Sequence, residues 1–339
     1  MRKSLISVLL IALLSGMLAA CSPAATPTAP APTEAAAAAE LKDVKVVFLL
    51  TQPLSPFEDD IWQWVNKAQA DGLTSEVKLI EMKNPTEYEQ TIRQVAEQGY
   101  NVIISTFFYV KEAFNKVAPD FPDTNFVLVY ETNDNDYPNM RGYLYDVQEG
   151  SYVCGVVAAN MTETNRVGFI GGDNNPGIVK FLAGYEAGLK SVNPDIQLDV
   201  TFAGTFIDPD KGHEMALALY DRGDDVIMHA ANMTGLGLFT AAKEEGKYAI
   251  GVDIDQSDQA PESVICSALS NPGPSVYNAI SDTATGKWNG TNVSWGIDDG
   301  VTSVALTDLV PDEVRAAAEA AEADIASGKV VPPQTTETE

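Results

Sequence analysis

Histidine and cysteine are scarce in this chain of 339 residues. The sequence contains only two histidines, His213 and His229, and three cysteines. The histidines are too far apart along the chain for the usual spacing of metal ligands. A Gly-x-Ser-x-Gly turn and a phosphate-binding loop are also missing. Because no nucleophile, base or metal site stands out, we predict a protein that is not an enzyme and needs no cofactor and no metal.

Basic residues are also few. The chain has 21 Lys and Arg against 48 Asp and Glu, which gives a formal net charge of -27. Such a surface repels nucleic acid and anionic lipid headgroups, so we exclude DNA and RNA as partners. Carboxylate pairs of the glycosidase type arise by chance among so many acids, and no motif singles one out. We interpret the acidity as an aid to solubility outside the cell.

Long apolar runs are confined to the start of the chain. Two basic residues precede the stretch Leu5–Leu18, which has the length of a signal-peptide core and is short for a membrane span. The sequence Leu-Ala-Ala-Cys that ends at Cys21 is similar to a bacterial lipobox. We therefore predict a signal peptide over 1–20 and a lipid on Cys21. The alternative is an ordinary secretory signal with an incidental cysteine.

The next segment, 21–40, is rich in Ala, Pro and Thr and has almost no bulky apolar residues. Such a composition cannot bury enough surface to fold, so we predict a disordered tether. A short disordered tail is expected at 333–339. The prediction is an extracytoplasmic protein that is attached to the bacterial cell membrane by its lipid anchor only.

Two further cysteines, Cys154 and Cys266, lie in apolar surroundings. A disulfide between them is an option for a protein outside the cytoplasm. We favour two buried free thiols, because a cysteine often packs as a small apolar side chain.

Apolar runs alternate with amphipathic stretches along most of the remaining chain. Predicted strands are Val44–Leu50, Val77–Met82, Val102–Ser105 and Phe126–Tyr130 in a first unit, and Arg166–Ile170, Gln197–Phe202, Val226–His229 and Tyr248–Val252 in a second. Predicted helices between them are Asp59–Gly72, Pro85–Gln98, Lys111–Ala118, Pro176–Ser191, Pro209–Asp221 and Gly235–Glu245. This rhythm predicts an α/β fold of two doubly wound parallel sheets, joined near Asp146–Ser151.

The last part of the chain adds elements that two consecutive domains do not need. We predict strands at Cys266–Ala268 and Ser303–Leu306 and helices at Ser275–Asn289 and Pro311–Ser327. The chain should therefore cross between lobes more than once, with 41–148 plus 269–298 in the N-terminal lobe and 149–268 plus 299–332 in the C-terminal lobe. This is a two-lobed, type I-like periplasmic-binding-protein fold, expected as a monomer, with the ligand in the cleft at the carboxyl ends of the strands.

Several ordered motifs resemble those of one family. They are Glu149–Gly155, Val167–Gly172, the series Phe181, Gly184, Tyr185 and Gly188, the run Gly204–Gly212, and the segments Asp225–Ile227, Thr234–Gly237 and Gly251–Gln256. In this order and spacing they are similar to the basic membrane lipoprotein (Bmp, PnrA-like) family of ABC transporter substrate-binding proteins. The resemblance implies uptake of a small molecule in partnership with a permease and an ATPase.

Characterised members of that family bind purine nucleosides, and some related proteins bind riboflavin. The resemblance implies that Phe57 and Phe206 stack on a flat base and that Asp253 accepts hydrogen bonds from ribose hydroxyls. It also places Thr234 and Gly235 at a helix start that could donate to a ligand. The alternatives are core packing for each phenylalanine, an N-cap or loop position for Asp253, and simple helix capping for the last pair.

Departures from the family pattern affect the base and sugar contacts. Glu58 replaces an asparagine, Tyr130 stands where the family has an aspartate, with Glu131 next to it, and Ser270 replaces a lysine. We include Glu58, Glu131 and Ser270 in the candidate site, together with Phe108 after the third strand. Riboflavin, a free base or another small molecule therefore remains an alternative ligand, and surface sensing remains an alternative to transport.

Overall fold

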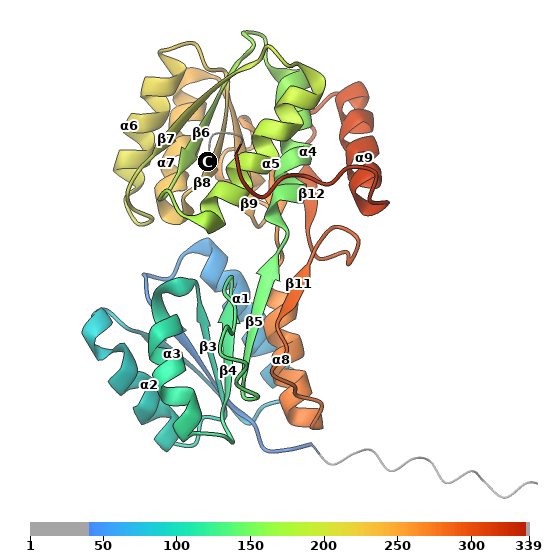
Figure 1. Ribbon diagram of the computed structural model, residues 1–339. Helices are drawn as coiled ribbons and strands as arrows, with labels where there is room; N and C mark the ends of the chain where they lie inside the picture. Colours follow the sequence, from blue (N-terminus) through green and yellow to red (C-terminus); the bar gives the residue numbers. More distant parts are fainter. Residues whose placement is uncertain (1–40, 337–339) are drawn as a thin grey trace, which may run out of the picture. The chain divides into compact units, whose positions relative to one another are not determined.

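The computed structural model describes residues 41–336. The predicted signal peptide 1–20, the tether 21–40 with Cys21, and 337–339 of the predicted tail lie outside the described residues. Figure 1 shows two sheets, each covered by helices, as the alternation of apolar and amphipathic segments predicts. In this part of the chain, no helix is both long and apolar enough to cross a membrane.

The first lobe is built on a six-stranded sheet whose paired strands are all parallel. Its order is β11 (Val293–Trp295), β5 (Met140–Tyr145), β4 (Asn125–Val129), β3 (Val102–Thr106), β1 (Lys45–Leu50) and β2 (Glu76–Glu81). Its helices are α1 (Pro56–Ala70), α2 (Tyr88–Glu97), α3 (Lys111–Val117) and α8 (Gly273–Thr285).

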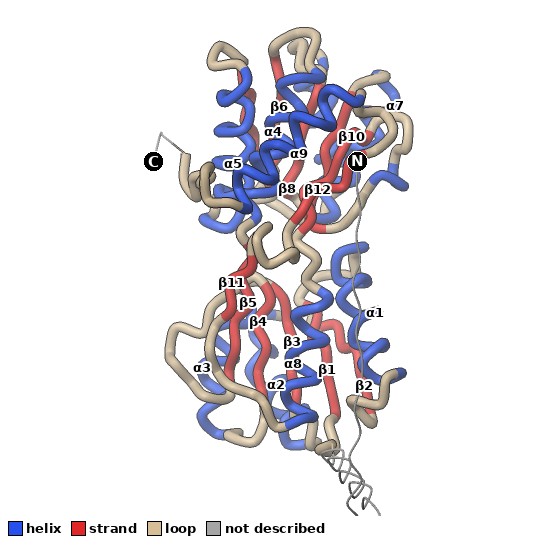
Figure 2. The backbone as a smooth tube through the Cα atoms, turned by 90° about the vertical axis from the view of Figure 1, so that its right-hand side faces the viewer, coloured by secondary structure: helices blue, strands red, loops and turns tan. Residues whose placement is uncertain are grey.

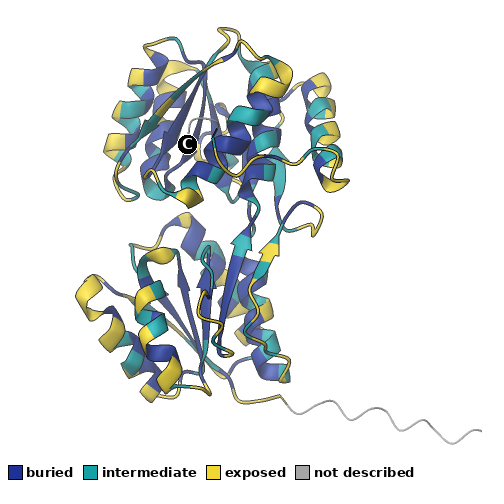
Figure 3. Ribbon diagram, in the orientation of Figure 1, coloured by how far each residue is buried: buried dark blue, intermediate teal, exposed yellow. Residues whose placement is uncertain are grey.

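Both faces of this sheet are covered, which explains the unbroken apolar runs of its strands. Alternate residues of β1 point to opposite faces, so Phe48 packs with α1 and α8 while Leu49 packs with α2 and α3. Figure 3 shows the central strands as buried and the outer helix faces as exposed. Short 3-10 turns lie at Pro85–Glu87, Phe108–Val110, Ala118–Asp120 and Ser257–Gln259.

The second lobe holds a similar sheet with one antiparallel edge. Its order is β12 (Ser303–Leu306), β10 (Val264–Leu269), β9 (Tyr248–Asp253), β8 (Val226–Ala230), β6 (Arg166–Gly171) and β7 (Gln197–Phe202). Its helices are α4 (Val147–Met161), α5 (Pro176–Val192), α6 (Pro209–Tyr220), α7 (Asn232–Glu245) and α9 (Asp312–Ala326). The prediction of parallel sheets is confirmed except at β12, which runs antiparallel to β10.

Three elements escaped the sequence prediction: β5, α4 and β11. The strand β5 contains Arg141 and Gly142, which are unusual in a buried strand; the arginine is nevertheless buried, because it pairs with Asp282 and lies 4.4 Å from the Trp288 ring. The helix α4 is buried on several sides, so its sequence lacks the alternation of apolar and polar faces that reveals a surface helix. The junction near Asp146–Ser151 is therefore the start of this helix.

Glycines of the family motifs let helices of the second lobe approach closely. A Cβ atom on Gly188 of α5 would lie 2.0 Å from the Tyr152 carbonyl oxygen of α4, and one on Gly184 would lie 2.1 Å from that of Gln148. A Cβ on Gly237 of α7 would similarly lie 2.0 Å from the Pro209 carbonyl oxygen of α6. These motif positions therefore serve helix packing.

The chain passes between the lobes three times, and the three crossings are bonded to one another. The first follows β5, the second joins β10 to α8, and the third joins β11 to β12. Glu149 accepts a hydrogen bond of 2.7 Å from the Ile297 amide, and the Asn271 side chain donates one of 2.9 Å to the Val301 carbonyl. Figure 2 shows β5 and β11, which pair in parallel, where the chain leaves the first sheet. The crossings form one compact connection that a hinge motion could use.

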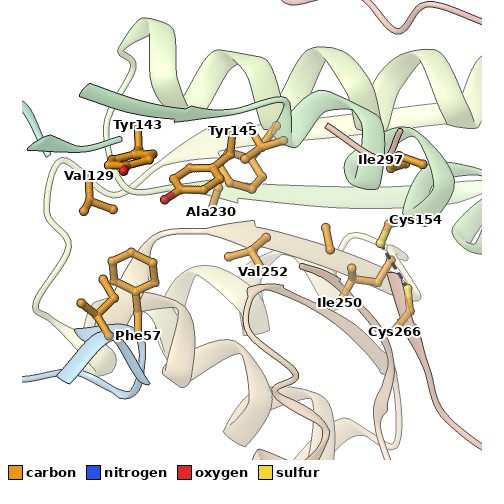
Figure 4. Packing of buried hydrophobic residues seen from close by; sticks show 14 of the residues in the cluster. Phe57, Val129, Tyr143, Tyr145, Cys154, Ala230, Ile250, Val252, Cys266 and Ile297 are labelled. Carbon is orange, nitrogen blue, oxygen red and sulfur yellow. Dashed lines mark hydrogen bonds between the residues drawn. The ribbon is translucent and has the colours of Figure 1, made fainter. Parts of the chain in front are cut away.

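Cys154 and Cys266 are free thiols within the core of the second lobe (Figure 4). Both are fully buried, and their sulfur atoms lie 3.5 Å apart, joining α4 to β10 by a thiol hydrogen bond. Burial raises the pKa of the Cys154 thiol, which keeps it protonated. The interpretation of these cysteines as two buried thiols is confirmed.

Candidate ligand-binding site

A cavity of about 530 Å³ lies where the carboxyl ends of the strands of both sheets meet. It is lined from the first lobe by Gln52, Phe107, Phe108, Tyr109, Tyr130, Glu131, Leu144 and Tyr145, and from the second by Val147, Asn175, Pro176, Gly177, Ile178, Lys180, Phe181, Phe206, Ala230, Ala231, Asn232 and Asp253. The lining is mostly apolar and rich in aromatic rings, with a few polar groups, as is typical of small-molecule sites.

The aromatic wall of the first lobe is formed by Phe107, Tyr130 and Tyr145. The rings of Tyr130 and Tyr145 are 4.7 Å apart, and those of Phe107 and Tyr130 are 5.8 Å apart. Phe57 lies behind this wall, with its ring 5.5 Å from Phe107, and is 5 % exposed. It does not line the cavity in this structure, so the core-packing alternative describes its present position.

The opposite wall carries Phe206, which does line the cavity. Its ring lies directly over Gly172, where a Cβ atom would be 2.1 Å from a ring carbon. The second glycine of the Gly-Gly pair after β6 therefore makes room for this aromatic side chain. Phe108 of the first lobe is 48 % exposed and, like Phe206, also borders a neighbouring, more polar cavity of about 570 Å³.

Asp253 supplies a partly buried carboxylate at the end of β9. Its Oδ1 accepts a hydrogen bond of 2.5 Å from the Tyr130 hydroxyl and one of 3.1 Å from the Ser270 hydroxyl. Within residues 41–336, its Oδ2 makes no hydrogen bond. Burial raises the pKa of Asp253 to about 6, although both hydrogen bonds lower it. The carboxyl group is therefore ionised near neutral pH and has one oxygen free to accept from a ligand.

The loop that carries Asp253 is anchored from below by Gln256 and His229. The Gln256 side-chain oxygen accepts from the Val252 amide at 2.8 Å and lies 3.0 Å from His229 Nε2. The Ala231 amide donates to His229 Nδ1, so the ring is neutral with its proton on Nε2. Burial lowers the pKa of His229 to about 4, in agreement with that state. This histidine is a structural group beneath the site.

Besides Phe57 and Ser270, three predicted site residues do not line the cavity. Glu58 is buried at the start of α1, where Ser55 hydrogen-bonds to it and burial raises its pKa. The Thr234 hydroxyl accepts from the Asp208 amide and donates to the Thr205 carbonyl. A Cβ on Gly235 would lie 2.0 Å from a nitrogen of the His229 ring. Thr234 and Gly235 lie in the first turn of α7, which has no side-chain cap, so they serve contacts with neighbouring segments rather than helix capping.

Glu131 lines the cavity, and its charge is balanced locally. Lys111 of α3 lies 2.9 Å from its carboxylate and also pairs with Asp134. Ser270 is fully buried and reaches the site only through its hydrogen bond to Asp253. The structure thus brings Phe108, Glu131, Phe206 and Asp253 to the cavity itself, with Ser270 directly behind them.

Sequence reasoning missed several lining side chains because their orientation depends on unusual backbone geometry. Phe107, Tyr130 and Asn232 have φ values of 63°, 66° and 48°, in the left-handed region that non-glycine residues rarely adopt. The predicted Asp253 shares this geometry, with a φ of 71°. Such strain concentrates at functional sites and needs the surrounding fold to maintain it. Tyr145, by contrast, would have been found by predicting β5.

Comparison with known proteins places the chain in a family. Residues 46–336 match the model of the Bmp family, described as ABC transporter substrate-binding protein PnrA-like. The chain is 34% identical over 266 residues to the ABC transporter nucleoside-binding protein BmpA of Lactococcus lactis subsp. cremoris, covering 73% of this chain and 75% of that protein. It is 31% identical over 306 residues to a purine-binding protein of Brucella abortus, covering 88% and 85%.

Solved structures show the same fold. An ABC transporter solute-binding protein from Aeropyrum pernix K1 has a TM-score of 0.79 and 24% identity, covering 87% of this chain and 95% of that one. A second, from Conexibacter woesei, has a TM-score of 0.69 and 26% identity, covering 87% and 100%. The fold and the cavity define a two-lobed solute-binding protein. The chain belongs to the Bmp family of ABC transporter substrate-binding proteins, and the resemblance seen in the sequence motifs is confirmed.

Proposed function

We propose that this protein captures a small flat heterocycle, a purine nucleoside, in the cavity between its lobes. The observation that carries the proposal is the combination of aromatic walls from both lobes with one carboxylate, Asp253, that keeps a free acceptor oxygen. Aromatic rings on both sides suit a planar base, and the carboxylate suits a sugar hydroxyl. The relatives in Lactococcus lactis and Brucella abortus, whose names say that they bind nucleosides and purines, support this choice.

The aromatic faces belong to different lobes, which gives binding a reason to be coupled to closure. Tyr130 and Tyr145 lie on the first lobe and Phe206 on the second. A ligand that contacts both faces binds more tightly to the conformation in which they are closest, so it shifts the population toward that conformation. We include this closure in the proposal.

Membership of the family supports a proposal for the cellular role. We propose that the protein is a monomeric lipoprotein, anchored through Cys21 outside the cytoplasmic membrane, which delivers its ligand to a permease and ATPase. The lipobox-like sequence before Cys21 supports the anchor. Cys21→Ser should give a protein that no longer partitions into the detergent phase of a Triton X-114 extract, and unchanged partitioning would exclude lipidation at this residue.

A free base or riboflavin is the second candidate. The observation in its favour is that Ser270, which stands where the family has a sugar-binding lysine, is fully buried and hydrogen-bonded to Asp253. The cavity lining therefore offers few groups for a sugar. A ligand without ribose would depend on the aromatic walls and much less on Asp253.

Two measurements test these alternatives. Mass spectrometry of the small molecule released by denaturing the purified protein identifies the ligand class directly. Calorimetry with guanosine, inosine, adenosine, guanine and riboflavin then compares wild type with Asp253→Asn. A nucleoside that uses Asp253 should lose roughly tenfold or more in affinity, while the free base should lose little. If no heterocycle binds more tightly than about 1 mM, the proposed ligand class is wrong.

A further inference from the structure

One hydrogen bond of the site joins side chains of the two lobes. Tyr130 follows β4 in the first sheet, and its hydroxyl reaches Asp253, which ends β9 in the second sheet. We propose that Tyr130 is a positioning residue that holds the Asp253 carboxylate across the cleft, so that ligand donors must converge on Oδ2. This inference rests on the proposed function in taking Asp253 as the ligand-binding group.

The ring of Tyr130 is fixed within the first lobe before it reaches the cleft. Phe57, Phe107 and Tyr145 surround it, with ring centroids 5.8, 5.8 and 4.7 Å away. Its amide also donates a 2.8 Å hydrogen bond to the Tyr143 carbonyl of the adjacent strand. This packing gives Phe57 a role despite its distance from the cavity, since it supports the residue that touches Asp253.

The hydroxyl can only be the donor in this contact. Burial, and then the charge of Asp253, raise the pKa of Tyr130 well above its usual range. A phenol that keeps its proton donates to an ionised carboxylate, which gives a charge-assisted hydrogen bond stronger than a neutral one.

Asp253 is held equally firmly from its own lobe. Its carbonyl oxygen accepts from the Ser270 amide at 3.0 Å, and its Oδ1 accepts from the Ser270 hydroxyl. Tyr130 and Asp253 both have left-handed backbone conformations, with φ of 66° and 71°. Two donors and two strained backbones thus fix the direction of a single side chain.

The consequence is a selective acceptor. A carboxylate oxygen has two lone-pair directions, and Tyr130 and Ser270 occupy both of those on Oδ1. Only Oδ2 remains for the ligand, so a vicinal diol cannot bridge the two oxygens. Oδ2 has two lone-pair directions of its own, so every ligand hydroxyl or N–H group that donates to Asp253 must converge on this one oxygen.

The first test uses two variants that remove donors from the same oxygen. Tyr130→Phe keeps the packed ring and removes only the cross-lobe hydrogen bond, while Ser270→Ala removes the bond made within the second lobe. Calorimetry with the best-binding nucleoside should show about a tenfold loss for Tyr130→Phe. When Asp253→Asn is already present, adding Tyr130→Phe should reduce the affinity little further, because the carboxylate that Tyr130 positions is already lost.

A second measurement needs no ligand. The pKa of Asp253, followed by NMR of its carboxyl carbon, should rise in Tyr130→Phe, because a donor to the ionised form is removed. The other titratable groups that interact with this carboxyl, Glu58 and Tyr145, are unchanged in this variant. Spin labels on the exposed Glu97 and Asp210 should also show a broader distance distribution between lobes in Tyr130→Phe than in Ser270→Ala.

These readouts separate two failures. If wild type binds no heterocycle, the proposed function is wrong, while the pKa and distance measurements still report the link between Tyr130 and Asp253. If wild type binds a nucleoside, and Tyr130→Phe has the same affinity and the same pKa of Asp253 as wild type, the positioning role of Tyr130 is wrong while the proposed function stands.

Discussion

The substitution Gly172→Ala should weaken ligand binding because the added methyl group displaces the ring of Phe206. A Cβ on Gly172 would lie 2.1, 2.3 and 2.7 Å from three carbons of the Phe206 ring. Carbon atoms in contact prefer roughly 3.5–4.0 Å, so the ring has to move by about 1.4 Å or more. Because Phe206 is partly exposed at the cavity, it can move without breaking the core. Loss of its stacking should cost about 1–3 kcal/mol, which is roughly a tenfold to hundredfold loss of affinity.

The assay for this substitution is calorimetry with the ligand identified by mass spectrometry, alongside thermal unfolding. Gly177→Ala is the matched control, because it adds a methyl group to the same cavity wall and meets only the Asn175 side-chain oxygen, at 3.3 Å. We expect weak binding in Gly172→Ala, near-normal binding in the control, and a change in unfolding free energy below about 1 kcal/mol in both. Wild-type affinity in Gly172→Ala, or an equal loss in both variants, would show that Phe206 does not stack on the ligand.

Three other properties follow from the structure. Burial raises the pKa of Asp253 to about 6, and a ligand donor needs the ionised carboxylate, so nucleoside affinity should fall as the pH drops through about 6. An affinity that calorimetry finds constant between pH 5 and 8 would contradict this. Asp224 is fully buried, neither of its oxygens has a hydrogen-bond partner among the described residues, and burial raises its pKa to about 6. A raised pKa favours folding only while the group is protonated, so the contribution of Asp224 to stability is complete below about pH 4 and lost as the pH rises through 6. In urea unfolding at pH 7.5, Asp224→Asn should have a free energy of unfolding higher than wild type by on the order of 2 kcal/mol, and at pH 4 it should show no gain. Closure on the ligand should reduce the radius of gyration in small-angle scattering, and tight binding without compaction would argue against hinge motion.

The sequence predicted those elements whose apolar pattern is contained in their own residues. The apolar run of β1 indicated a strand buried on both faces, and the glycines after β6 and within α5 marked the family motifs. Strand β5 was missed because Arg141 is buried through partners at Asp282 and Trp288, which are about 140 positions away in the chain. No local pattern contains that information.

The sequence predicted which loops form the candidate site better than it predicted which side chains line the cavity. Asp253 and Phe206 line the cavity, as the position of their loops after parallel strands suggested. Phe57 lies one layer deeper, because Phe107 and Tyr130 turn their rings in front of it from left-handed backbone positions. Sequence gives the residue type at such positions, whereas the direction of the side chain depends on the assembled fold.

The three crossings between the lobes impose an order on folding. The first sheet is completed by β11, and its outer face by α8, and both follow nearly the whole of the second lobe in the chain. During synthesis or export from one end to the other, the first lobe must therefore wait, with part of its apolar surface uncovered, until about residue 295 has emerged. A fragment ending before α8 should expose that surface and aggregate, and at the same point the second lobe lacks β12 and α9. The topology thus leaves the segment that is made first without its complete core until nearly the whole chain has been made.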